Sequence, residues 1–149
     1  RFDLAARGNP AQCTQAKTEV ARGVALATNM VLDGFSLDVD GRAIPIDRSR
    51  PIPFTWSQTP GPVDFFTVQV VELVAINGVT RSLGRGLIAV AGQTTAMIDP
   101  ALLQPGRTYI MVVTSSIGRP NVAQGDWMTL QLPFENTAIW SHYFEVAEP

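Results

Sequence analysis

From residue 35 onward the chain alternates apolar and polar side chains, which is the period of a strand with one buried face. Residues 35–40 show this alternation, and residues 65–73 show it most clearly, with Phe66, Val68 and Val70 on one face. The same pattern predicts strands at 35–40, 52–58, 65–73, 87–91, 94–98, 108–115 and 139–146. Many short strands separated by glycine and proline are typical of an all-β domain.

Two dipeptides predict tight turns. Asp40-Gly41 would join the strand at 35–40 to a partner that begins near Ala43, forming a hairpin. Asn77-Gly78 predicts a second turn, within an irregular connection over residues 74–86. Gly84-Arg85-Gly86 lacks the third glycine and the following helix of a phosphate-binding loop, so we interpret it as a turn as well.

The first 34 residues follow neither period consistently. Asn9-Pro10 resembles a helix start, and Cys13, Ala16 and Val20 follow near helical spacing. Residues 20–32 fit an extended chain equally well. We therefore expect residues 1–34 to form an N-terminal extension that packs on the main domain or is partly disordered, and residues 35–149 to form that domain.

Length, charge and composition narrow the class of protein. The 149 residues suit one domain, and 11 basic residues against 13 acidic ones, with no basic run, predict no nucleic-acid partner. The longest apolar stretches, 87–91 and 110–113, are far shorter than the ~18 residues of a membrane span, so none is expected. The single cysteine, Cys13, predicts neither a disulfide nor a metal site. Residues 1–10 lack the apolar run of a signal peptide.

The sequence around Tyr109 resembles a known family. Trp56 in an early strand, and Leu103-x-Pro105-Gly106-x-x-Tyr109 leading into an apolar strand, resemble the fibronectin type III domain. The resemblance covers about residues 35–146 and implies a two-sheet antiparallel β-sandwich with a non-family segment before it. It implies that the Tyr109 hydroxyl bonds to backbone a few residues upstream. It also implies that Trp56 and Tyr109 are neighbours in the core.

Strand parity adds a prediction about the surface. If Tyr109, Met111 and Val113 point inward, then Ile110 and Val112 point outward, as does Val71 under the same rule. An outward apolar stripe needs cover. We expect either the segment before residue 35 or another protein to lie over it.

Three acidic residues suggest a calcium site only weakly. Asp38-x-Asp40-Gly41, with Asp47 downstream, has part of the oxygen-rich spacing that calcium prefers. The third acid of the loop and the closing glutamate are missing, so a strand followed by an Asp-Gly turn is favoured. We expect no metal and no cofactor.

The sequence also contains few candidate catalytic residues. His142 is the only histidine, and with Ser141 and either Asp126 or Glu135 it has the residue types of a serine hydrolase. No G-x-S-x-G elbow is present and His142 falls within a predicted strand, so a sheet histidine is favoured and no catalytic residue is expected.

Two tryptophans could form an aromatic platform for a sugar or a peptide. They are Trp127, in the loop before the last strand, and Trp140. Half-buried packing is the more ordinary role for such residues.

These observations lead to two function classes. The first is a non-catalytic structural or protein-interaction module of a secreted or cell-envelope protein, a location implied by the resemblance alone. The alternative is a carbohydrate- or peptide-binding accessory domain of a larger extracellular enzyme. A protein or glycan partner is expected in either case, and a hydrolase that uses His142 is the least favoured interpretation.

Overall fold

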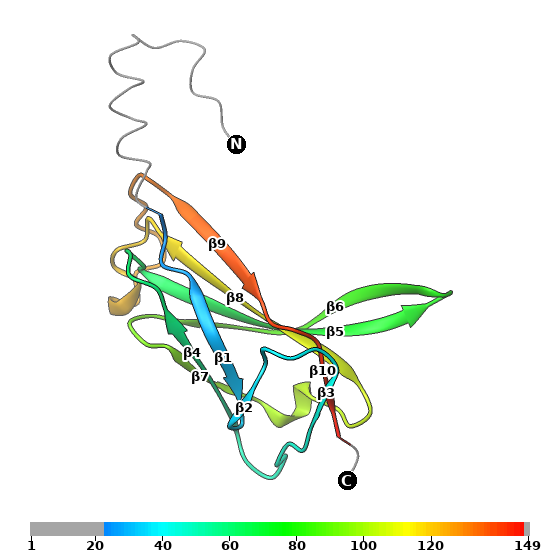
Figure 1. The fold of residues 1–149 in the computed structure, drawn as a ribbon. Helices are drawn as coiled ribbons and strands as arrows, with labels where there is room; N and C mark the ends of the chain where they lie inside the picture. The colour runs from blue at the N-terminus through cyan, green and yellow to red at the C-terminus, as the bar shows by residue number, and fades with distance from the viewer. Residues whose placement is uncertain (1–22, 148–149) are drawn as a thin grey trace.

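Residues 23–147 are described by the computed structural model, and they form two β-sheets packed face to face (Figure 1). The first sheet has the strand order β2-β1-β4-β7, and all its pairs are antiparallel. Its strands are β1 (Ala27–Leu32), β2 (Phe35–Ser36), β4 (Ile52–Gln58) and β7 (Thr95–Ile98). The strands predicted at 52–58 and 94–98 are thus confirmed.

The second sheet is larger and has the order β3-β10-β8-β5-β6, with β9 paired to β8 as well. Its strands are β3 (Arg42–Ile44), β5 (Phe65–Ile76), β6 (Val79–Val90), β8 (Thr108–Ile117), β9 (Glu135–Trp140) and β10 (Phe144–Val146). Every pair is antiparallel except β3 with β10, which is parallel. Two short 3-10 helices, η2 (Pro100–Leu102) and η3 (Val122–Gln124), lie in connections. The predicted all-β, two-sheet architecture is confirmed.

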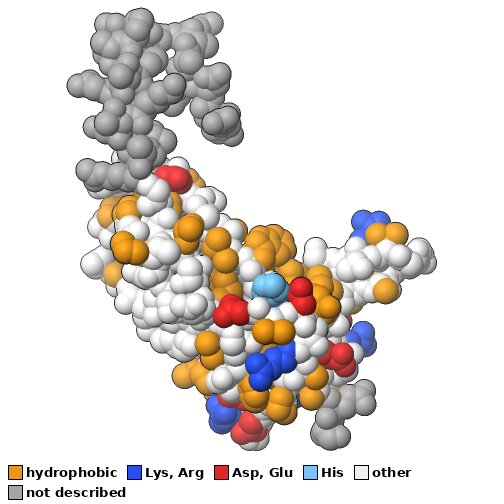
Figure 2. Space-filling model, viewed as in Figure 1, with side chains coloured by type: hydrophobic (Ala, Val, Ile, Leu, Met, Phe, Trp, Pro, Cys, Tyr) orange, Lys and Arg blue, Asp and Glu red, His pale blue; other side chains and the backbone are white. Residues whose placement is uncertain are grey.

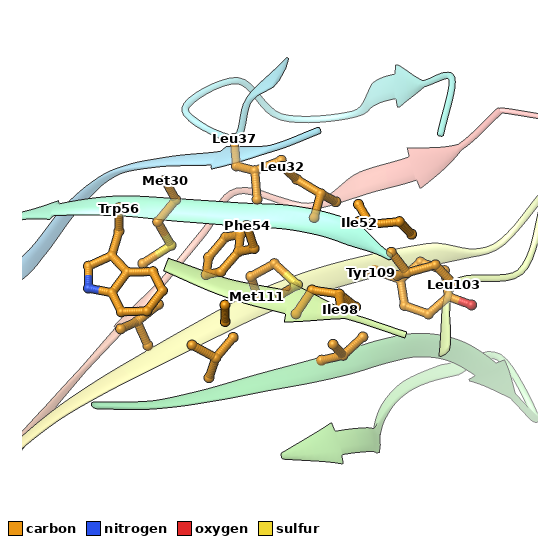
Figure 3. Packing of buried hydrophobic residues seen from close by; sticks show 14 of the residues in the cluster. Met30, Leu32, Leu37, Ile52, Phe54, Trp56, Ile98, Leu103, Tyr109 and Met111 are labelled. Carbon is orange, nitrogen blue, oxygen red and sulfur yellow. The ribbon is translucent and has the colours of Figure 1, made fainter. Parts of the chain in front are cut away.

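One hydrophobic core fills the space between the sheets (Figure 3). Ile52 and Phe54 of β4 are completely buried, and Tyr109, Met111 and Val113 of β8 face them with no exposed surface. Alternate residues of each strand point inward, as the period of two requires. Full burial of one such side chain stabilises the fold by about 1.5–3 kcal/mol.

The corner before β8 forms as the resemblance implied. The Tyr109 hydroxyl accepts a hydrogen bond from the Gln104 backbone N–H, five residues upstream, at 2.8 Å. Leu103 is fully buried beneath this corner, and η2 precedes it. The phenol therefore packs in the core while its hydroxyl satisfies an otherwise unpaired backbone donor.

Trp56 and Tyr109 are not core neighbours, and that expectation is wrong. Figure 3 places them at opposite ends of the core, with Phe54 and Met111 between them. The Trp56 ring packs against Phe54, with centroids 5.5 Å apart, whereas the nearest ring to Tyr109 is that of Phe144, at 6.0 Å. Strands β4 and β8 run in the same direction, so a residue near the end of β4 and one near the start of β8 lie far apart (Figure 1).

The sandwich begins before residue 35, so the predicted domain boundary lies too late. Strand β1 pairs with β4 inside the first sheet, and Met30 and Leu32 belong to the core. A bulge between Thr28 and Val31, with Asn29 at φ 50°, interrupts the alternation of β1. The first part of the predicted extension, residues 1–22, lies outside the described residues.

The hairpin predicted around Asp40-Gly41 is also wrong. Only residues 35–36 of the expected 35–40 strand are extended, and β2 pairs with β1. The Asp40-Gly41 turn exists, with Gly41 at φ 68°, but it sends the chain across to the second sheet, where β3 pairs with β10. Val39 is consequently 58% exposed instead of inward.

The connection predicted over residues 74–86 is a long hairpin instead. Strands β5 and β6 pair from Phe66 with Val90 to Ile76 with Val79. Asn77 and Gly78 make the turn, both with positive φ (52° and 76°), as a two-residue hairpin loop requires. The tip of this hairpin projects from the body of the sandwich (Figure 1).

The last predicted strand, 139–146, is two strands that differ in register by one residue. Trp140 of β9 pairs with Val112, whereas Phe144 of β10 pairs with Tyr109. Between them the Ser141 hydroxyl accepts from the Met111 N–H at 2.9 Å, so the strand break leaves no unpaired donor there. Phe144 and Val146 share the inward face, as predicted.

The outer face of the second sheet carries the predicted apolar stripe, but no described residue before 35 covers it, because β1 lies in the other sheet. Val112 lies opposite Trp140, and Val112 and Val71 are each only 5% exposed. The indole of Trp140 is itself 60% exposed. The edge strand β9 therefore contributes part of the cover, and Figure 2 shows hydrophobic side chains gathered along it.

Candidate binding end of the sandwich

Three connections meet at one end of the sandwich, where β4, β6 and β8 finish (Figure 1). They are residues 59–64 between β4 and β5, residues 91–94 between β6 and β7, and residues 118–134 between β8 and β9. Loops clustered on a rigid scaffold are where binding residues concentrate. This end of the sandwich is therefore the candidate binding end.

A half-open cavity of about 440 Å³ lies between the first two of these connections. This volume falls within the range of small-molecule sites, about 300–1,000 Å³. Its wall combines aromatic, apolar and uncharged polar side chains with one carboxylate. The lining residues are Trp56, Ser57, Gln58, Val63, Asp64, Phe66, Gly92, Gln93 and Thr94.

Trp56, one of the residues that line this cavity, carries a buried donor without a partner. The side chain is only 4% exposed, and its Nε1 has no hydrogen-bond partner. The indole also packs edge-on against Phe66, with centroids 5.2 Å apart. In Figure 3 the indole nitrogen points away from the labelled core residues. An unpaired buried N–H is rare and carries a desolvation cost of about 1–3 kcal/mol.

Asp64 is held rigidly in the cavity wall. Its Oδ2 accepts hydrogen bonds from the backbone N–H groups of Gly118 and Arg119, each at 2.7 Å. Its own backbone N–H donates to the Ser116 carbonyl at 2.9 Å. The carboxylate thereby fastens the start of the 118–134 connection to the cavity.

The 118–134 connection presents a row of exposed hydrophobic side chains. Met128, Leu130 and Leu132 are 87%, 61% and 93% exposed, and Trp127 and Phe134 are also exposed. We call residues 127–134 the apolar segment. This segment was not predicted, although its alternation of apolar and polar residues after Gly125 is a visible signal in the sequence.

Asp126 organises the start of the apolar segment. Its carboxylate accepts from the Thr129 hydroxyl at 2.5 Å and from the backbone N–H groups of Met128 and Thr129. The hydrogen bond from the Thr129 hydroxyl, with those backbone bonds, lowers the pKa of Asp126 to about 2. Asp126 thus caps backbone N–H groups within its own loop. The carboxylate that pairs with His142 is that of Asp40 instead.

The hydrolase residues do not form a triad. His142 Nδ1 lies 2.8 Å from Asp40 Oδ1, a pairing that the sequence analysis did not predict. The Ser141 hydroxyl donates to the backbone carbonyl of His142, so it is not bonded to the imidazole. The imidazole is on the surface beside acidic side chains (Figure 2), with half of it exposed. Glu135, at the start of β9, is not its partner either.

The three acidic residues considered as calcium ligands each bind a different protein partner. Asp38 accepts from the Ser36 hydroxyl, Asp40 pairs with His142, and Asp47 accepts from Ser49 and Arg50. Within residues 23–147 no three acidic, histidine or cysteine side chains are grouped closely enough to hold a metal ion. Cys13 lies outside the described residues.

The two tryptophans of the predicted platform lie over different parts of the second sheet. Trp127 packs edge-on against Phe65, with centroids 5.3 Å apart, and Phe65 pairs with Ser116. Trp140 pairs with Val112, which is four residues away along β8, or about 13 Å. The structure does not bring them together as one surface.

A buried ion pair at the other end of the sandwich also escaped the sequence analysis. Glu72 is only 1% exposed, and Arg85 binds its Oε2, with Nε at 2.6 Å. Arg107 Nη1 lies 3.6 Å from the other oxygen. Arg85 is the extra residue at the register shift where Val70 pairs with Gly86 and Val71 with Gly84. The bulge explains how this arginine reaches an inward carboxylate.

No protein-family model, curated protein or solved structure gives a significant match to this chain. In the part of the chain that the structure covers, no helix combines the length and apolar character needed to cross a bilayer.

Proposed function

We propose that this chain is a fibronectin type III-like β-sandwich that serves as a non-catalytic protein-interaction module of a secreted or cell-envelope protein. The likeness is supported by a sheet containing β1, β4 and β7 that faces one containing β10, β8, β5 and β6. It is also supported by the bond from the Gln104 N–H to the Tyr109 hydroxyl. The location follows from this likeness.

The apolar segment is the observation that carries the interaction role. Five large hydrophobic side chains within residues 127–134 are exposed, and Leu132 is exposed at 93%. Exposed apolar clusters of this kind mark protein-interaction sites more often than isolated surface residues do. Asp126 and the close approach of the segment to Gly118 hold it in place before any partner arrives. A preformed loop loses less conformational entropy on binding.

The non-catalytic part of the proposal rests on His142 and Ser141. The imidazole pairs with Asp40, and the hydroxyl of the adjacent Ser141 is engaged with the Met111 N–H and the His142 carbonyl. A general base must lie within hydrogen-bond reach of the nucleophile it activates. The contact between His142 and Asp40 therefore favours a structural role, in which it links residues 37–41 to the chain between β9 and β10.

Photo-crosslinking tests the interaction role. A benzophenone amino acid at position 128, whose side chain is 87% exposed, should form one discrete protein adduct in cells that make the protein. The adduct should disappear in the double variant Leu130→Ser/Leu132→Ser and persist in Met97→Ser, which changes a residue 62% exposed in β7. Circular dichroism shows whether both variants are folded. Absence of an adduct, or equal loss in both variants, contradicts the proposal.

A further inference from the structure

The hairpin of β5 and β6 ends in a projection that leaves the body of the sandwich, and we call residues 73–84 the arm (Figure 1). Strand β6 is the last strand of the second sheet on this side. Within residues 23–147, its backbone hydrogen-bonds to β5 alone. An edge with unpaired N–H and C=O groups is a template to which another extended chain can add as a strand.

The edge of β6 lacks the features that commonly prevent such pairing, namely short length, proline and cover by another element. The edges of the first sheet, β2 and β7, are only two and four residues long. Strand β6 has 12 residues and no proline. The bulge at Arg85 lies at the base of the arm, so residues 79–84 form a regular stretch. These residues are therefore open to strand addition.

The side chains along this stretch define what an added strand would meet. Residues that lie opposite each other in an antiparallel pair share a face of the sheet. Glu72 pairs with both Tyr109 and Leu83, so Leu83 lies on the face that bears the core. Arg81 and Val79 follow on the same face at intervals of two. Leu83 is 41% exposed and Val79 53% exposed, so this face presents an apolar, a cationic and an apolar group in turn.

The charge of the arm is positive, although the chain as a whole has a net charge of −2. Arg81 is exposed and forms no ion pair with a described residue, and Figure 2 shows a basic side chain on the projecting hairpin. The only acidic residue of β5 and β6 is Glu72, which is buried between Arg85 and Arg107. A carboxylate therefore meets attraction at Arg81 and a second cation would meet repulsion.

We propose that the edge of β6 binds an extended segment of a partner protein in which an acidic residue has an apolar residue two positions before it and two positions after it. The segment adds as an antiparallel strand, with its carboxylate opposite Arg81 and its apolar side chains opposite Val79 and Leu83. Cross-strand pairs of opposite charge stabilise a sheet, whereas like charges destabilise it. Strand β6 begins in the arm and finishes at the end that carries the apolar segment, so the two surfaces lie at opposite ends.

Two matched peptides test this proposal. The acidic peptide is acetyl-Thr-Val-Thr-Glu-Thr-Val-Thr-amide, and the basic peptide has lysine in place of the glutamate. In a nitrogen–proton correlation spectrum, we expect the acidic peptide to shift the backbone amide signals of residues 79–84 saturably at millimolar concentration. The hydrogen exchange of these amides should slow at the same time. The basic peptide should bind about tenfold more weakly, because it replaces an opposite-charge pair by a like-charge pair.

Methylation of the peptide backbone shows whether binding is strand addition. Successive N–H groups of a strand point to opposite edges. One form of the acidic peptide is methylated at the four threonine nitrogens, and the other at the remaining three nitrogens. Only one edge of the peptide faces β6, so one form should lose binding and the other should keep it.

A matched pair of variants shows whether Arg81 sets the preference for acid. Arg81→Glu should reverse it, so that the basic peptide binds more tightly. Arg48→Glu makes the same charge change in the exposed connection between β3 and β4 and should leave the preference unchanged. Circular dichroism shows whether both variants are folded, and the comparison of the two peptides on the unaltered chain requires no variant.

Four results would overturn the proposal. The first is that neither peptide shifts the signals of residues 79–84, and the second is that both bind equally well to the unaltered chain. The third is that both methylated forms bind. The fourth is that the chain alone sediments as a dimer with the β6 amides already protected from exchange, since the occupant of the edge would then be a second copy. Loss of peptide binding in Arg81→Glu should leave the crosslink at position 128 intact.

Discussion

Gly118 allows a quantitative test of how the apolar segment is held. A Cβ at this position would lie 2.8 Å from the Gln131 carbonyl oxygen and 3.0 Å from the Phe134 Cα, both of which are backbone atoms. The backbone of Gly118 also has φ +100°, which side-chain-bearing residues rarely adopt. Gly92 also has a positive φ, of +67°, but a methyl group added there would have nothing within 4 Å. Gly92→Ala therefore measures the cost of the backbone conformation without any steric clash.

Gly118→Ala should therefore be far more destabilising than Gly92→Ala. The strained φ costs about 1–3 kcal/mol, and forcing a methyl group into an occupied space adds about 1–3 kcal/mol. Gly92→Ala carries only a left-handed penalty of about 1–2 kcal/mol. The reduced entropy of the unfolded chain offsets the cost equally in both variants, so it cancels in their difference. The expected difference in the free energy of unfolding is about 2–4 kcal/mol.

Denaturant unfolding measures this difference directly, and thermal unfolding should show a Tm about 5–15 °C lower for Gly118→Ala than for Gly92→Ala. Hydrogen exchange should in addition increase over residues 127–134 in Gly118→Ala alone. Equal stability of the two variants would refute the reasoning, since it would mean that residues 131 and 134 move away from Gly118 at no cost.

Three other predictions concern single side chains. Tyr109→Phe should lower the free energy of unfolding by about 1–2 kcal/mol, because it leaves the Gln104 backbone N–H unpaired. The control Tyr143→Phe changes an exposed ring and should alter the free energy of unfolding by less than about 0.5 kcal/mol. Urea unfolding measures both variants. Arg85→Met should be more destabilising than the double variant Glu72→Gln/Arg85→Met, because the single change leaves a buried carboxylate without its nearest cation, and the reverse order in urea unfolding would contradict this. The pKa of Asp126 is lowered when folded, so its contribution to holding residues 126–129 is present above about pH 4 and is lost as the pH falls toward about 2. Asp126→Asn should remove that pH dependence from Trp127 fluorescence, and an unchanged profile would contradict it.

Local motifs were predictable from the sequence, and long-range register was not. Leu103, Pro105-Gly106 and Tyr109 lie within seven residues of one another, so their corner could be recognised without knowing the rest of the fold. Strand β1 could be predicted only as one of two alternatives, because the bulge at Asn29 breaks the alternation that identifies a strand. The break between β9 and β10 was missed for a related reason, since the Ser141 hydroxyl takes the place of a backbone partner.

The cavity could not be predicted for a different reason. Its wall comes from the end of β4, the start of β5 and the connection before β7, segments that lie far apart along the chain. Nothing in the sequence near Trp56 indicates that its indole nitrogen lacks a partner, because that depends on how all three segments close around it. The contact between Asp40 and His142 could not be predicted for the same reason, because sequence spacing alone does not determine the distance between residues 102 positions apart.

The cavity and the apolar segment lie at the same end of the sandwich, and Asp64 links the cavity wall to the connection that carries the segment. Its carboxylate belongs to the cavity wall, yet the same group fixes the Gly118 and Arg119 N–H groups from which the 118–134 connection departs. Hydrogen bonds to a charged acceptor are stronger than neutral ones, so this attachment is firm. The 118–134 connection is therefore fixed at its first two residues by Asp64, while Asp126 orders the start of the apolar segment farther along the same connection.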